Sequence, residues 1–122
     1  MQQNTWVQLM DMRARDSHAV ILPYTFSVLG TFAFIIWGGD ALETGAIQLA
    51  IAAWVVLVSL WTLLWFDGVI GDLAAGMKDM DSELTDSNMG QNFAKAPFAI
   101  FRGFNALVII VMAVLQLTAL YS

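Results

Sequence analysis

Residues 46–66 read AIQLAIAAWVVLVSLWTLLWF, a run without a single charged side chain. A helix rises 1.5 Å per residue and needs about 20 apolar residues to cross a hydrocarbon core of about 30 Å. Residues 19–39 and the segment after Arg102 are equally free of charge. Because a helix satisfies its own backbone hydrogen bonds inside lipid, the sequence predicts three transmembrane helices.

The composition of the whole chain also indicates that lipid is its solvent. Of the 122 residues, 59% are hydrophobic and only 12% are charged, with a mean hydropathy of +0.70. Soluble domains are nearer half apolar and a quarter charged. We therefore predict an all-α membrane protein with five segments: an N-terminal cytoplasmic or interfacial segment (1–18), transmembrane helices at 19–39, 46–66 and 97–121, and an acidic cytoplasmic amphipathic helix and loop (67–96).

The orientation follows from the basic residues, which cluster on the cytoplasmic side of membrane proteins. Two precede the first predicted span, and the others lie between the second and third spans or at the start of the third: Arg13, Arg15, Lys78, Lys95 and Arg102. The connection between the first two spans contains Asp40 and Glu43 but no Lys or Arg. We therefore expect the N-terminus inside and the C-terminus outside, in an integral membrane protein of a bacterial inner membrane.

The segment between the second and third spans has an apolar stripe at helical spacing, formed by Leu73, Met77, Met80 and Leu84. Such spacing is typical of an amphipathic helix. The charged residues of the other face are mostly acidic (Asp72, Asp79, Asp81 and Glu83 against the single Lys78), whereas helices that bind anionic lipid carry basic polar faces. We therefore predict that the stripe contacts a protein partner. A plain cytoplasmic extension of the second span is the alternative.

Several classes of function lack the residues that they require. The chain has no cysteine, which excludes thiolate metal sites, iron–sulfur clusters and cysteine nucleophiles. The net charge of −5 and the scattered basic residues argue against nucleic acid as a partner. No carboxylate, lysine or histidine lies at the middle of a predicted span, so the usual groups of a proton or ion pathway are missing. No catalytic or metal-binding residue is predicted.

His18 is the single histidine and stands directly before the first span. The spacing of Ala14 and His18 resembles the pigment-ligand pattern of bacterial light-harvesting polypeptides, although there the histidine lies inside the span. That resemblance implies a chlorophyll ligand at His18. The alternative is a histidine at headgroup level beside the carboxylate of Asp16. The chain also resembles the small subunits of succinate dehydrogenase in size and span count, but lacks their haem-ligand histidines within the membrane.

Three tryptophans of the second span share one helical face: Trp54, Trp61 and Trp65. Tryptophan is common at membrane interfaces, which accounts for Trp65 but not for Trp54 near the predicted mid-membrane level. A tryptophan face at that depth either packs against another helix or lines a flat apolar cofactor such as a quinone, carotenoid or chlorophyll ring. His18, Trp54 and Trp61 are therefore the candidate cofactor-binding residues.

The few polar side chains within the spans predict contacts between helices. Gln48 and Gln116 fall at comparable depth, where a hydrogen bond between them is expected. Arg102 and Asp67 both lie at the cytoplasmic level, where an ion pair between them is expected. Both contacts would hold the second and third spans together.

These features predict a small, non-catalytic accessory subunit of a larger integral membrane complex. We expect its partners to be other membrane subunits, and we expect the parent complex to be a respiratory or photosynthetic electron-transfer assembly with lipid, quinone, carotenoid or chlorophyll at a subunit interface. The second hypothesis is a subunit that binds a pigment or quinone. The third is a self-associating pore or holin-like protein, although no amphipathic span is present to line a water-filled channel.

Overall fold

The computed structural model describes residues 2–122, and this part of the chain contains helices and no strand. The elements in chain order are α1 (Gln3–Trp37), the 3-10 helix η1 (Gly39–Glu43), α2 (Gly45–Lys78), α3 (Ser82–Asp86), α4 (Asn88–Ala94) and α5 (Phe98–Leu120). Three of them, α1, α2 and α5, are long and apolar enough to cross a membrane. The prediction of an all-helical chain with three such helices is confirmed.

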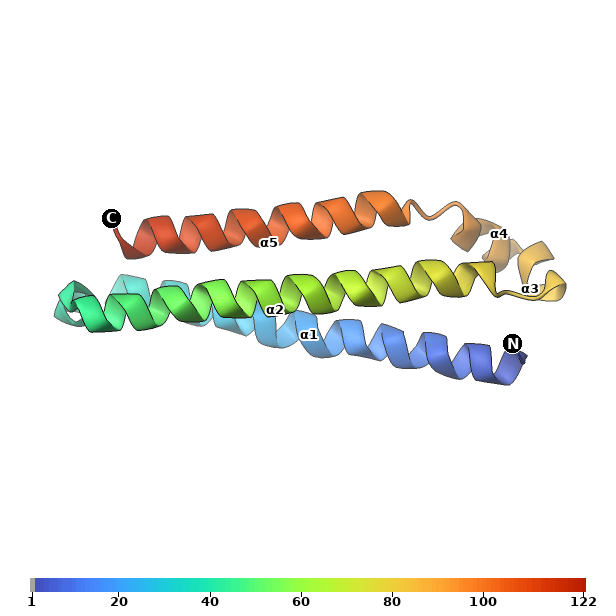
Figure 1. Ribbon diagram of the computed structural model, residues 1–122, viewed down its shortest axis with the longest axis horizontal. Helices are drawn as coiled ribbons and strands as arrows, with labels where there is room; N and C mark the ends of the chain where they lie inside the picture. The colour runs from blue at the N-terminus through green and yellow to red at the C-terminus, as the bar shows by residue number, and fades with distance from the viewer. Residues whose placement is uncertain (1) are drawn as a thin grey trace.

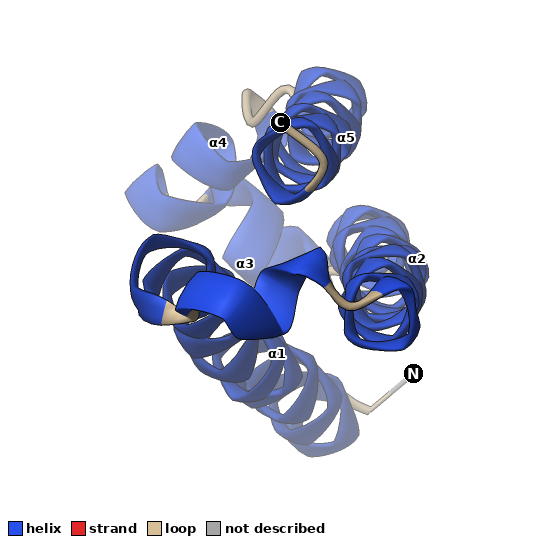
Figure 2. Cartoon of the chain, turned by 90° about the vertical axis from the view of Figure 1, so that its left-hand side faces the viewer, coloured by secondary structure: helices blue, strands red, loops and turns tan. Residues whose placement is uncertain are grey.

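The three long helices lie side by side and alternate in direction (Figure 1). Seen along the bundle, they occupy the corners of a triangle (Figure 2). Helix α2 packs closely against both α1 and α5, whereas α1 and α5 contact each other much less. The N-terminus, α3 and α4 lie at one end of the bundle, and η1 and the C-terminus lie at the other (Figure 1). All five basic residues belong to segments at the first end, which we call the basic end.

Few side chains are buried, and most of them are small or β-branched. They are Val28 and Thr31 on α1, Val55, Ser59, Thr62, Val69 and Ile70 on α2, and Ile109, Gln116 and Leu120 on α5. Small side chains let helix backbones approach closely, which is how helices associate in lipid. The large apolar side chains on the outside of the bundle, such as Phe26 and Leu64, need no burial because the hydrocarbon core is itself apolar.

Helix α1 extends much further toward the N-terminus than the predicted span 19–39. The predicted segment 1–18 is not separate from that span, because the helix begins at Gln3 and passes through Pro23 without ending. Contacts with the C-terminal part of α2 hold this extension in place. The Trp6 indole Nε1 donates a hydrogen bond to the Gly76 carbonyl at 2.7 Å, and Arg13 Nε lies 2.9 Å from Asp72 Oδ2. Trp6, which suits a membrane headgroup, therefore binds the protein's own backbone.

The connection at 67–96 differs from a single amphipathic helix followed by a loop. Helix α2 continues to Lys78, a turn follows, and two short helices replace the rest. Asp81 and Ser87 explain the breaks, because their side chains accept hydrogen bonds from the backbone N–H groups of Leu84 at 2.8 Å and Gly90 at 2.9 Å. Such N-caps start new helices. The same Asp, Ser and Asn residues favour a loop when they are read from sequence alone.

Candidate functional site

A cavity of about 480 Å³ lies between all three long helices, in the half of the bundle nearer the basic end. We call it the central cavity. It is lined by Ile21, Tyr24 and Thr25 of α1, by Thr62, Phe66 and Ile70 of α2, and by Phe101, Phe104, Asn105, Val108 and Ile109 of α5. These residues recur every three or four positions on each helix, so each helix presents one face to the same space. The volume is within the range of small-molecule sites.

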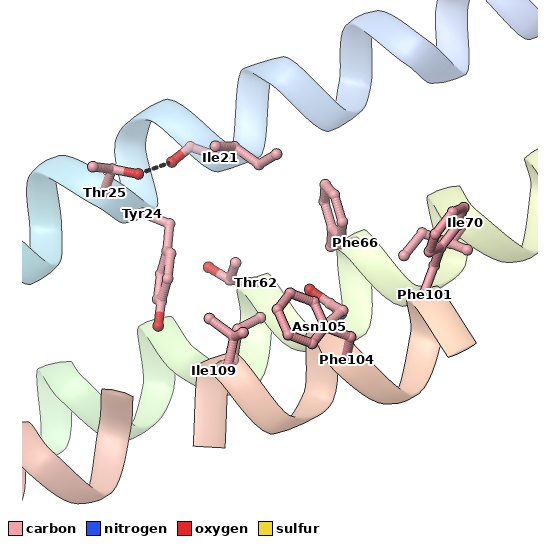
Figure 3. Close-up of a pocket in the computed structure, with 11 residues that line it drawn as sticks. Ile21, Tyr24, Thr25, Thr62, Phe66, Ile70, Phe101, Phe104, Asn105 and Ile109 are labelled. Carbon is pink, nitrogen blue, oxygen red and sulfur yellow. Dashed lines mark hydrogen bonds between the residues drawn. The ribbon is translucent and has the colours of Figure 1, made fainter. Parts of the chain in front are cut away.

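Two polar side chains of the central cavity have unsatisfied atoms. The hydroxyl of Tyr24 and the amide nitrogen of Asn105 are both buried and have no hydrogen-bond partner among the described residues. Figure 3 shows Tyr24 extending from α1 toward the other two helices, with Asn105 and Phe104 on α5 and Phe66 on α2 further along the cavity. The hydroxyl of Thr25, in contrast, is satisfied by the Ile21 carbonyl at 2.9 Å.

A second hollow surface follows the contact between α1 and α2. It consists of two adjoining hollows of about 570 and 340 Å³ that share Ser27 and Trp54, and we call it the α1/α2 groove. Toward the end of the bundle opposite the basic end, the floor of the groove contains small residues, including Gly30, Ala46 and Ala50. No side chain of the described residues fills the space beside Gly30. Small residues at such a surface allow another helix to approach closely.

The two candidate tryptophans on this groove have different surroundings. Trp54 Nε1 donates a hydrogen bond to Ser27 Oγ at 2.9 Å, so this indole joins α1 to α2. Trp61 lies two turns further along α2, lines the same groove and is 73% exposed. Trp54 therefore has a role within the chain, whereas most of the Trp61 ring is available to something outside it.

His18 does not lie with these tryptophans. It is exposed on α1 near the basic end and lines neither hollow of the α1/α2 groove. The structure therefore does not bring the three candidate cofactor-binding residues together. Within residues 2–122, no three His, Asp or Glu side chains are grouped closely enough to hold a metal ion.

Arg102 and Asp67 form a two-point ion pair between α5 and α2. Arg102 Nε and Nη2 donate to the two carboxylate oxygens of Asp67, each at 2.7 Å. This planar arrangement fixes the relative positions of the two helices as well as neutralising both charges. The pair lies on the same part of the bundle as Ile70 and Phe101, at the basic end of the central cavity.

Of the two glutamines, only Gln48 links α2 to α5, whereas Gln116 bonds within α5. Gln48 Nε2 donates to the Leu120 carbonyl at 3.4 Å, and Gln116 Nε2 donates to the Met112 carbonyl at 3.0 Å. The predicted Gln48–Gln116 bond is therefore replaced by bonds to backbone carbonyls. Helix C-termini leave their last carbonyls free, and Leu120 ends α5, so its oxygen is an available acceptor.

The predicted partner-contact stripe is divided among three segments. Leu73 and Met77 lie on α2, Met80 lies in the turn, and Leu84 lies on α3. All four side chains are half-buried. The face of α2 that the N-terminal part of α1 covers is a different one, with Gly76 buried directly beneath Met10.

Sequence reasoning did not identify the central cavity. Neither Tyr24 nor Asn105 is among the candidate residues predicted from the sequence. Both positions carried a signal: a polar side chain within an apolar span faces the bundle interior more often than lipid. The alignment of their helical faces, however, depends on how the three helices are rotated. Comparison with protein-family models, with curated proteins and with solved structures finds no match for the chain.

Proposed function

We propose that this chain is a non-catalytic accessory subunit of a larger integral membrane complex in a bacterial inner membrane, with its basic end in the cytoplasm. The observation that carries the proposal is the α1/α2 groove, which has small residues along its floor and the mostly exposed Trp61 at its edge. We propose a transmembrane helix of another subunit as its occupant. An electron-transfer assembly is the class of complex that we favour.

The chemistry of the groove supports a helix as the occupant. None of the described residues that line it is charged, so a polar or charged partner would find no complement there. Apolar helices associate in lipid through close van der Waals contact, which the surface of Gly30, Ala46 and Ala50 permits. A large ring such as that of Trp61 then contributes most when it is enclosed by a partner rather than by mobile lipid chains.

The test uses Trp61, because its replacement leaves the Trp54–Ser27 hydrogen bond in place. Affinity-tagged protein is solubilised from native membranes in a mild detergent and separated on a density gradient. We expect wild type to migrate with its complex and the Trp61→Ala variant to migrate largely free of it. Phe26→Ala is the matched control, since Phe26 is an aromatic residue of α1 that is 70% exposed and lines neither hollow of the groove.

Two results would contradict the proposal. If wild type migrates only as a monomer or homo-oligomer, the chain is not an accessory subunit. If Phe26→Ala detaches the chain while Trp61→Ala does not, a partner exists but the α1/α2 groove is not its contact. Replacing Met77 and Met80 with aspartate tests the predicted contact of the apolar stripe in the same gradient, because an unpaired carboxylate is costly to bury.

A further inference from the structure

Helices α3 and α4 form a compact hairpin, residues 82–94, that has little contact with the three long helices. The two short helices pack against each other, whereas neither has extensive contact with α1, α2 or α5. At their junction the Ser87 hydroxyl donates to the Leu84 carbonyl at 2.6 Å, and the buried Gly90 lies against the same carbonyl. Seen along the bundle, α4 lies outside the triangle of the long helices, to one side of α5 (Figure 2).

The two helices of this hairpin differ in charge. Helix α3 and its N-cap carry three carboxylates, those of Asp81, Glu83 and Asp86, whereas α4 carries no charged residue. On α4, Met89 and Phe93 are four residues apart and therefore share one helical face, where they are 63% and 43% exposed. A helix of seven residues is marginal in water by itself, so an exposed apolar face on it indicates a surface against which it packs.

The connection to α5 keeps α4 close to the level at which α5 leaves the lipid. The 23 residues of α5 extend about 35 Å, little more than a hydrocarbon core of about 30 Å, so Phe98 lies near its boundary. Only residues 95–97 separate α4 from Phe98, and they are folded: the Ala96 N–H donates to the Phe93 carbonyl and the Phe98 N–H to the Ala96 carbonyl, both at 3.0 Å. Five residues reach at most about 18 Å even when fully extended, so Phe93 remains near the membrane surface.

We propose that α4 lies in the headgroup layer of the leaflet at the basic end, with Met89 and Phe93 inserted among the lipid chains and the acidic α3 turned toward water. Helices that lie on membranes bury their apolar face about 5–10 Å into this boundary. The exposed Ile100 and Phe101 at the start of α5 extend the same apolar surface into the lipid. The exposed Lys95 follows α4 at the level of the lipid phosphates. Because the polar residues of α4 are uncharged, a zwitterionic lipid is sufficient as the partner.

The experiment uses the full chain alone in dioleoylphosphatidylcholine nanodiscs. The chain has no cysteine, so a nitroxide can be attached to single-cysteine variants of the natural sequence. Electron paramagnetic resonance then compares collisions with oxygen, which concentrates in lipid, and with a water-soluble nickel chelate. We expect Met89→Cys and Phe93→Cys to collide more often with oxygen, and Gln91→Cys on the opposite face of α4 and Glu83→Cys on α3 to collide more often with nickel. A thiol in the headgroup layer is still reached by thiol reagents from the basic end.

Two results would overturn the proposal. If the labels at 89 and 93 meet nickel as readily as the label at 91, α4 lies in water. If both are shielded from oxygen and nickel alike, the face packs against protein instead of lipid.

A second measurement avoids the bulk of the nitroxide. Phe93→Glu places a charge where burial in lipid is costly, so amide exchange in residues 88–94 should be faster in this variant. Gln91→Glu is the matched control on the opposite face and should leave that exchange unchanged. Equal exchange in the two variants would contradict the insertion of Phe93. Neither measurement needs a partner subunit, so both outcomes are independent of the proposed function.

Discussion

Replacing Trp54 with alanine removes two contributions to the contact between α1 and α2. A tryptophan in a well-packed site costs about 3–5 kcal/mol when it is truncated to alanine. Trp54 is 55% exposed, so slightly less than half of that packing, about 1.5–2 kcal/mol, belongs to contacts within the chain. Its hydrogen bond to Ser27 adds about 0.6 kcal/mol on average for such bonds between membrane helices, and at most about 1.7 kcal/mol. The sum is about 2–4 kcal/mol.

Trp61→Ala is the comparison that tests this reasoning. Its ring is 73% exposed and forms no hydrogen bond within the described chain, so the same calculation gives a loss of about 1 kcal/mol. Unfolding of the purified protein in mixed detergent and SDS micelles, followed by circular dichroism, measures both losses. Equal losses for Trp54→Ala and Trp61→Ala would refute the assignment of Trp54 to the α1–α2 contact.

The hydrogen bond can be isolated by a double-mutant cycle with Trp54→Phe and Ser27→Ala, because phenylalanine keeps most of the ring. We expect a coupling free energy of about 0.6–1.7 kcal/mol. Val58→Ala combined with Ser27→Ala is the control pair, since Val58 lies on the same groove but has no hydrogen-bonding group. A coupling of zero in the first cycle would mean that the Trp54–Ser27 bond contributes nothing to stability.

Three further outcomes are expected. Gly90→Ala should disrupt the junction of α3 and α4, because a Cβ there would collide with the Leu84 carbonyl. Gly103→Ala is the control, since a Cβ there meets open space, and it should be neutral or slightly stabilising. Amide hydrogen exchange measures the difference, and we expect residues 82–94 to exchange faster in Gly90→Ala only. Cysteines replacing the exposed Glu43 and Met89 should label from opposite sides of the membrane, with position 89 reached from the cytoplasm, and labelling of both from one side would contradict the orientation. Reconstituted alone in liposomes, the chain should conduct no ions, since no charged side chain lines the central cavity; a reproducible single-channel conductance would favour the pore hypothesis instead.

The spans were predictable from sequence because their signal is simple. Length and the absence of charge locate 19–39, 46–66 and the stretch that follows Arg102 without any knowledge of packing. The ends of the helices were less predictable, because nothing in the residues 1–18 marks where lipid ends and water begins along one continuous helix. The contact of Trp6 with the Gly76 carbonyl joins residues that are far apart in the sequence, so no local pattern reveals it.

Predictability of individual contacts depended on how many partners were available. Asp67 and Arg102 are the charges that border the second and third spans, so each had one obvious partner at the same level. Gln48 had many, because every backbone carbonyl near a helix end can accept its hydrogen bond, and the Leu120 carbonyl was the one within reach. Predicting the central cavity would have required knowing how each of the three helices is rotated about its axis. Apolar spans without a polar face do not specify that rotation.

The unequal lengths of the three helices have a mechanical consequence. At 1.5 Å per residue, the 34 residues of α2 extend about 51 Å, against a hydrocarbon core of about 30 Å. The 23 residues of α5 extend only about 35 Å. Helices α1 and α2 are therefore long enough to continue beyond a hydrocarbon core as a two-helix stalk, joined by the Trp6–Gly76 bond and the Arg13–Asp72 pair, whereas α5 is little longer than such a core. Because α2 is unbroken from Gly45 to Lys78, the α2 residues that hold the stalk together and the cavity wall formed by Thr62, Phe66 and Ile70 belong to one continuous helix.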